Sequence, residues 1–230
     1  MSPGRGPTRR TLLLGLVPGA LITFAGRRAR ARTMIARRFL YLQPLGDDLP
    51  GEDVTMVKTA LESLIGLSVK VLPRADMPAN AWFPARRRHR ADKLLDFLDG
   101  RLPADGTRIL GLTGTDISTT KDKVFDWGVL GLGRIDGASM VISRFRCAMK
   151  SRGAAHARER LAKVAVHETG HTLGLEHCPN RGCLMEDAES RVATSDREYD
   201  FCARCRKLLA EAGRPLPATP AIPWSRPGPA

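Results

Sequence analysis

The sequence VAVHETGHTLGLEHC, from Val164 to Cys178, contains three of the five histidines of this 230-residue chain. His167 and His171 are four residues apart, so a helix would place both imidazoles on one face, about one turn apart, where they can bind one metal ion. Gly174 can adopt the left-handed conformation that commonly ends a helix. The turn that follows would bring His177 back as a third ligand. This spacing therefore predicts a three-histidine metal site at the end of a helix.

Three protein ligands leave the fourth position of a tetrahedral zinc open to water, as in catalytic zinc sites. Glu168 follows the first histidine directly and cannot easily bind the same ion, but it can hydrogen-bond a zinc-bound water. Such a water titrates near pH 7, so a neighbouring carboxylate can take its proton. Glu168 is therefore the candidate general base of a hydrolase. The alternative, a helix whose histidines only pack or face solvent, is disfavoured because histidine is scarce elsewhere in the chain.

Four of the five cysteines follow the histidines in the order Cys178, Cys183, Cys202 and Cys205. They form a C-x4-C pair and a C-x2-C pair separated by eighteen residues, a pattern that suits a structural zinc bound by four thiolates. Two disulfides are the alternative, which an oxidising compartment would permit. Cys147 stands apart and is expected to be a small buried residue. The sequence thus predicts two zinc ions per chain, although three imidazoles also suit other first-row metals.

These residues resemble the metzincin zinc peptidases and, among them, the archaemetzincins. Met185 lies at the position of the metzincin Met-turn, and Ala188 stands where the family usually has serine. The four cysteines match the archaemetzincin framework. The resemblance implies a compact α/β metallopeptidase domain with one catalytic and one structural zinc, acting on a peptide or protein substrate. The metzincin pattern HExxHxxGxxH is matched at His167, Glu168, His171, Gly174 and His177.

Hydrophobic periodicity elsewhere predicts alternating strands and helices, which is typical of an α/β fold with parallel strand pairs. The resemblance adds a metzincin-like mixed sheet with an active-site helix, followed by a small C-terminal subdomain that holds the cysteines. An extended peptide is expected to bind along the edge strand 127–134. Strands are expected at 39–46, 67–73, 107–114, 124–134 and 138–146, and helices at 53–64, 91–102 and 154–173.

The peptidase domain is expected to span residues 34–213, with subdomains at 34–174 and 175–213. Six prolines occur among the sixteen residues after Arg214, so residues 214–230 are expected to form a disordered tail.

Residues 1–31 resemble a twin-arginine export signal. The pair Arg9-Arg10 precedes an apolar run at 12–25, and 29–31 form a small-x-small cleavage site. Fourteen apolar residues are too few to span a bilayer, which requires about 20. The chain is therefore expected to be exported, to a periplasmic or extracellular location, without a stable membrane span. The alternative is that Met34 is the true start and the protein is cytoplasmic.

The formal net charge is +13, and it would fall to +7 without residues 1–31, which contain six arginines and no acidic residue. A basic surface can indicate nucleic-acid binding, but the densest run, 86–90, has no aromatic ladder around it. Nucleic-acid binding is therefore not favoured, and a monomer is expected. The alternative to a peptidase is a catalytically weak, zinc-stabilised binding protein that uses this basic surface.

Overall fold

The computed structural model describes residues 39–46, 49–189 and 191–226. The leader expected at 1–31 and the alternative start at Met34 lie outside these ranges. Within them, no helix is both long enough and apolar enough to cross a membrane.

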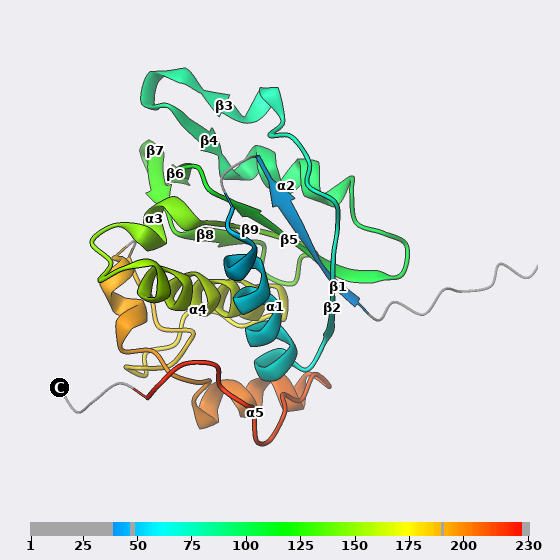
Figure 1. Ribbon diagram of the computed structural model, residues 1–230. Coiled ribbons are helices and arrows are strands. Elements are labelled where there is room, and N and C mark those ends of the chain that lie inside the picture. Colours follow the sequence, from blue (N-terminus) through cyan, green and yellow to red (C-terminus); the bar gives the residue numbers. More distant parts are fainter. Residues whose placement is uncertain (1–38, 47–48, 190, 227–230) are drawn as a thin grey trace, which may run out of the picture. The chain divides into compact units, whose positions relative to one another are not determined.

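A five-stranded sheet in the order β2-β1-β5-β9-β8 forms the centre of the described chain (Figure 1). Strands β2, β1, β5 and β9 are parallel, as the predicted crossovers require, whereas β8 pairs antiparallel with β9 and forms one edge. The sheet is therefore mixed, which confirms the expected fold class. Its strands are β1 (Phe39–Leu45), β2 (Ser68–Val71), β5 (Gly106–Thr113), β8 (Gly131–Gly133) and β9 (Ser139–Ser143).

Helices cover both faces of this sheet. Alternate residues of β1 point to opposite sides, so Leu40 and Leu42 pack into the core beside α1 and α4, whereas Tyr41 packs into a second core beside α2. Helices α1 and α4 lie together on one face in Figure 1, and α2 lies on the other. The bounds are α1 (Gly51–Ile65), α2 (Ala91–Asp99) and α4 (Ala154–Thr172).

A second sheet, in the order β3-β4-β6-β7, was not expected from the sequence as a separate unit. The single strand expected at 124–134 is divided at Leu130, because β7 pairs with β6 in the small sheet and β8 pairs with β9 in the large one. Two short 3-10 turns lie near its first strands. The elements are β3 (Trp82–Phe83), β4 (Arg88–Arg90), β6 (Ile117–Lys121), β7 (Val124–Val129), η1 (Ala79–Ala81) and η2 (Pro84–Arg86).

The strand expected at 138–146 ends at Ser143 and continues as a short helix, α3 (Arg144–Ala148). Arg144 forms an ion pair with Asp53 of α1, and Arg146 forms one with Asp116. These pairs turn the two arginines toward carboxylates of other elements.

After α4 the chain contains η3 (Val192–Asp196) and α5 (Ala203–Glu211), neither of which was predicted. The described part of the tail, 214–226, differs from the disordered segment that its proline content indicated. Trp224 is buried, and its indole N–H donates a hydrogen bond to the carbonyl of Tyr199 at 3.0 Å. Leu216 and Ile222 also pack against the main core. Three apolar side chains thus stabilise the tail on the domain despite its six prolines.

Candidate metal centres

Helix α4 and the turn after it bring the three predicted histidines together. The Nε2 atoms of His167 and His171 are 3.1 Å apart, and each ring lies within 5.4 Å, centroid to centroid, of the ring of His177. One nitrogen from each imidazole can be chosen so that all three lie within 4.8 Å of one another. This donor set fits a zinc ion, because neutral imidazole is a common zinc ligand and three leave one position open.

Backbone carbonyls fix the two helical histidines in one tautomer. The Nδ1 atom of His167 lies 2.7 Å from the carbonyl oxygen of Leu184, and that of His171 lies 2.7 Å from the carbonyl oxygen of Leu175. A carbonyl can only accept, so each Nδ1 carries the proton and each Nε2 presents a lone pair. Burial lowers the pKa of His167 to about 3 and also lowers that of His171, which keeps both rings neutral.

The third histidine lies on a loop and is half exposed. Gly174 has a φ of +94°, the left-handed conformation expected at the end of the helix, and its N–H donates to the carbonyl of His171 at 2.9 Å. The Nδ1 atom of His177 lies 3.4 Å from Oδ2 of Asp187, an interaction that the sequence analysis missed. Asp187 follows Met185 by two residues, so proximity to the Met-turn was the available signal.

Glu168 is buried beside the histidines, with 7% of its surface exposed. Burial raises the pKa of its carboxyl to about 8, although a hydrogen bond from the Gly133 N–H acts in the opposite direction. A Cβ atom at Gly131 would lie 2.7 Å from the Glu168 carboxylate, and one at Gly133 would lie 2.8 Å from its carbonyl oxygen. The two glycines therefore let β8 approach α4 closely enough to enclose the carboxylate. The sequence GLG in the expected edge strand was the only signal of this contact.

Met185 is fully buried beneath α4, at the position expected for the Met-turn. A Cβ atom at Gly170 would lie only 2.3 Å from its Sδ atom. Gly170 lies between the two helical histidines, so the absence of a side chain there lets the methionine pack against the helix backbone directly below the site.

The histidines and Glu168 border a cavity of about 400 Å³ that is open to solvent. Its lining comes from β6, β7, β8 and α4, and from Asp187, Ala188, Glu189, Ser195 and Glu198. The lining includes Lys121, Trp127, Leu132, Val164, Ala188, Ser195 and Glu198.

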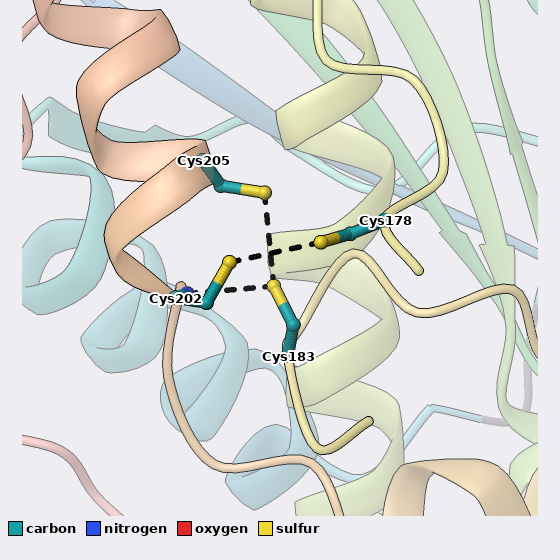
Figure 2. A group of neighbouring side chains, drawn as sticks. All are labelled: Cys178, Cys183, Cys202 and Cys205. Atoms are coloured by element: carbon teal, nitrogen blue, oxygen red, sulfur yellow. Dashed lines mark hydrogen bonds between the residues drawn. The ribbon is translucent and has the colours of Figure 1, made fainter. Parts of the chain in front are cut away.

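The four predicted cysteines form a second cluster (Figure 2), in which every Sγ atom lies within 4.8 Å of the others. Cys178 and Cys202 have sulfurs 3.6 Å apart, and those of Cys183 and Cys205 are 3.7 Å apart. These distances exceed the disulfide bond length of about 2.05 Å. They fit a tetrahedral zinc, because Zn–S bonds of about 2.3 Å place ligand sulfurs roughly 3.8 Å apart.

The environment of this cluster favours the thiolate of Cys183, whereas burial raises the pKa of Cys178 and the contact with Cys183 raises that of Cys205. Hydrogen bonding with Cys205 lowers the pKa of Cys183 to about 5, and the N–H groups of Met185 and Cys202 donate to its sulfur at 3.5 and 3.4 Å. Cys202 and Cys205 lie at the start of α5, where the helix dipole stabilises negative charge. The fifth cysteine, Cys147, is buried, and burial raises the pKa of its thiol to about 12.

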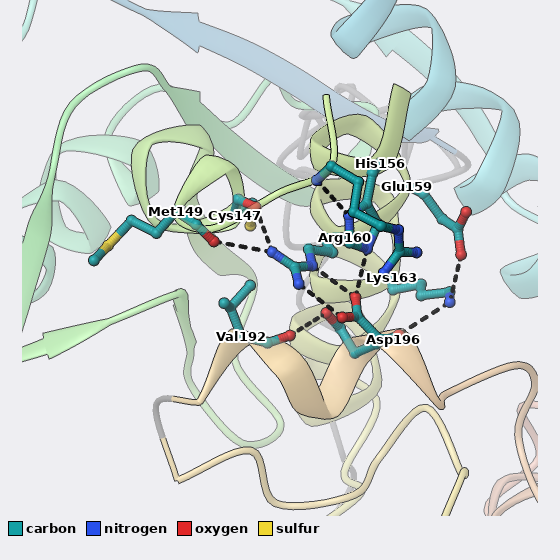
Figure 3. A network of polar contacts seen from close by, with 10 residues as sticks. Cys147, Met149, His156, Glu159, Arg160, Lys163, Val192 and Asp196 are labelled. Atoms are coloured by element: carbon teal, nitrogen blue, oxygen red, sulfur yellow. Dashed lines mark hydrogen bonds and ion pairs between the residues drawn. The ribbon is translucent and has the colours of Figure 1, made fainter. Parts of the chain in front are cut away.

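A buried ion-pair network holds η3 against α4 (Figure 3). The guanidinium of Arg160 donates to both carboxylate oxygens of Asp196, at 2.6 and 2.7 Å, and His156 approaches the same carboxylate at 2.7 Å. Although burial opposes it, hydrogen bonding from Arg160 and His156 lowers the pKa of Asp196 to about 2. This network fixes the segment that forms the far wall of the cavity.

The densest basic run is largely neutralised by acidic side chains. Arg88 lies 3.1 Å from Asp126, and Arg90 lies 3.1 Å from Asp92. Such pairing reduces the positive potential that nucleic-acid binding would require.

Comparisons with known proteins agree with this geometry. The profile of Peptidase family M54 matches residues 51–211. The archaemetzincin of Archaeoglobus fulgidus is 34% identical over 170 residues, which cover 74% of this chain and 98% of that relative. The crystal structure of the Methanopyrus kandleri archaemetzincin aligns with a TM-score of 0.66 at 32% identity, over 76% of this chain and 94% of that one. The malonate complex of the Archaeoglobus fulgidus protein aligns with a TM-score of 0.62 at 34% identity, over 74% and 98% of the two chains.

The profile match spans more than half of the chain, and the archaemetzincin relatives are covered almost from end to end. This chain belongs to Peptidase family M54, the archaemetzincins, and is a zinc metallopeptidase that acts on peptide or protein substrates.

Proposed function

We propose that the chain hydrolyses peptide bonds at a zinc bound by His167, His171 and His177, with Glu168 as the general base. The observation that carries this proposal is the position of Glu168, which is buried on the wall of an open cavity beside three imidazoles whose Nε2 or Nδ1 atoms converge. When bound there, zinc supplies a Lewis acid that polarises a carbonyl and lowers the pKa of water.

Within this mechanism Glu168 moves a proton. Its carboxylate accepts a proton from the attacking water and then donates it to the leaving amine. A pKa raised by burial supports this role, because a general base and acid works best when its pKa is near the working pH. The hydrogen bond from the Gly133 N–H and the close contact with Gly131 hold the carboxylate in one orientation.

We propose that substrate binds in extended form beside β8. This strand lies at the edge of the large sheet, pairs only with β9 within that sheet, and contributes residues to the cavity wall. An added strand would place a peptide backbone along the glycines that flank Glu168, which is a common mode of peptide recognition. The sequence predicted peptide binding along the whole stretch 127–134, and the proposal now limits it to β8, residues 131–133.

We also propose that Cys178, Cys183, Cys202 and Cys205 bind a second zinc that stabilises the fold. The sulfur distances and the burial of Cys178, Cys183 and Cys205 support a closed site. Export through the leader at 1–31 and a monomeric state stay predictions from the sequence, since they depend on features outside the described residues or on solution behaviour.

A peptide-library assay tests the proposed function. We expect the purified full chain to cleave peptides when loaded with zinc, to lose activity with a chelator and to regain it when zinc is restored. Nucleic-acid binding that weakens with salt, without any zinc-dependent cleavage, would support the basic-surface alternative instead.

A further inference from the structure

The cavity extends beyond the histidines to a carboxylate that the proposed mechanism does not use. Val164 lies one turn before His167 on α4 and lines the cavity, and Ser195 and Glu198 line it as well. Glu198 follows η3 by two residues. The same cavity thus contains the candidate catalytic centre and three further acidic residues, of which Asp187 and Glu189 are exposed and Glu198 is buried.

Glu198 is buried without a partner. Only 3% of its surface is exposed, and its side chain has no hydrogen bond or ion pair among residues 39–46, 49–189 and 191–226. Burial raises the pKa of its carboxyl well above the ordinary value. A largely buried carboxylate that lacks a hydrogen-bonded or ion-paired partner is costly to ionise, and a cationic ligand entering the cavity would supply that partner.

The nearest candidate partner within the fold is already occupied. Lys163 is fully buried on α4, and its Nζ atom contacts Oε1 of Glu159 at 2.7 Å and donates to the carbonyl of Ser195 at 3.0 Å. Its charge is therefore balanced by Glu159. Lys163 and Arg197 act on Glu198 through longer-range charge interactions only, and the like charge of Glu186 counteracts them.

The wall that carries Glu198 is held rigidly in place. Asp196 receives two hydrogen bonds from Arg160 of α4, and Lys163 binds the carbonyl of the residue before it. Figure 3 shows both contacts joining η3 to the helix. Because η3 is fixed on two sides, Glu198 cannot readily swing outward to reach solvent.

We propose that Glu198 is a specificity-determining residue that selects substrates with a basic side chain, lysine or arginine, next to the scissile bond. An arginine or lysine stem would pass Val164 and bring its charged end to the carboxylate. This inference rests on the proposed peptidase function, and it concerns the same cavity.

A small-molecule binding measurement tests the site without requiring catalysis. Butylguanidinium mimics an arginine side chain, and butylurea is its neutral counterpart. We expect calorimetry on the zinc-loaded full chain to detect butylguanidinium binding, with butylurea at least about tenfold weaker. Glu198→Gln should weaken butylguanidinium binding by about 10- to 100-fold, whereas Glu211→Gln, on α5 and outside the cavity lining, should leave it unchanged. Equal binding to wild type and Glu198→Gln would overturn the proposal.

Peptide cleavage kinetics provide a second test of the role of Glu198 in substrate selection. Matched peptides should carry arginine, leucine or glutamate on either side of one scissile bond. We expect wild type to prefer arginine on one side, and Glu198→Gln to lower kcat/KM for that peptide by at least about tenfold while changing the leucine peptide less than about threefold. An unchanged arginine-to-leucine ratio would contradict the role of Glu198. If no peptide is cleaved at all, the peptidase proposal fails, and the butylguanidinium comparison still decides the binding site.

Discussion

The histidine cluster and the cysteine cluster differ in how they face solvent. His177 is half exposed and all three histidines border an open cavity, whereas three of the four cysteines are buried and the fourth is only partly exposed. Three ligands beside a cavity leave room for a reactant, and four ligands in a closed shell leave none. Access to solvent, more than ligand type, therefore separates a catalytic zinc site from a structural one.

The two clusters are also mechanically linked. Cys178 follows His177 directly, and its N–H donates to the carbonyl of Met185 at 2.7 Å. The loop that carries the exposed histidine is therefore anchored on one side by a cysteine of the closed cluster. A change in the closed cluster should disturb the open one, whereas a change at the open cavity should leave the closed cluster intact.

The largest expected effect separates catalysis from metal binding. Glu168→Gln should lower peptide turnover by about 10³-fold or more, because the proposed general base is lost. Zinc content should stay the same, since Glu168 is not a proposed ligand. Steady-state kinetics and metal analysis of the same preparation check both statements, and a variant retaining a tenth of wild-type activity would remove Glu168 from the mechanism.

The closed cluster should dominate stability. Cys205→Ala removes one ligand from α5, and we expect it to lower the free energy of unfolding by at least about 4 kcal/mol, or roughly 10 °C in the midpoint of thermal unfolding. Cys147→Ala is the matched control, because it removes a buried thiol outside the cluster. Equal zinc content in wild type and Cys205→Ala would argue against a four-cysteine zinc.

A smaller effect is expected at the floor of the open site. Gly170→Ala would force a Cβ atom against Sδ of Met185, and we expect it to cost about 3 kcal/mol of stability. Gly51→Ala, which meets nothing within 4 Å, serves as the control. In a Met185→Ala background the additional cost of Gly170→Ala should fall below about 1 kcal/mol. Strictly additive costs would show that the two residues do not clash.

The smallest expected effect is a pH dependence in the cavity wall. The folded state lowers the pKa of Asp196 from 3.8 to about 2, so its ion pair adds stability above about pH 4 that is lost as pH falls through 2. Asp196→Asn should therefore cost about 2 kcal/mol between pH 5 and 8, and the gap to wild type should narrow below pH 4. Denaturant unfolding at several pH values measures this gap, and one that stays constant down to pH 2 would contradict the assignment.

The sequence carried most of the local information about both clusters. Helical spacing placed His167 and His171, and the left-handed glycine placed His177, because these geometries depend on neighbouring residues only. Contacts between distant segments were not visible in the same way. The close approach of β8 to Glu168 depends on Gly131 and Gly133, which lie 37 and 35 residues earlier in the sequence. The division of the expected strand at Leu130 depends on pairing, because β7 pairs with β6 of the small sheet and β8 pairs with β9 of the large one.

The tail after Arg214 also shows that contacts between distant segments cannot be predicted from local sequence. Proline content indicated disorder after Arg214, but Trp224 is buried and donates a hydrogen bond to the carbonyl of Tyr199, 25 residues earlier in the sequence. Composition describes what a segment can do alone, whereas its placement depends on the surface that the rest of the fold presents.

The central claim is that one chain binds zinc at an open three-histidine centre and at a closed four-cysteine centre. Zinc per folded chain, measured by elemental analysis for wild type and for His171→Ala, tests it most directly. We expect two zinc ions in wild type and one in a folded but inactive His171→Ala variant. A single zinc in wild type, or the same zinc content in both proteins, would contradict it.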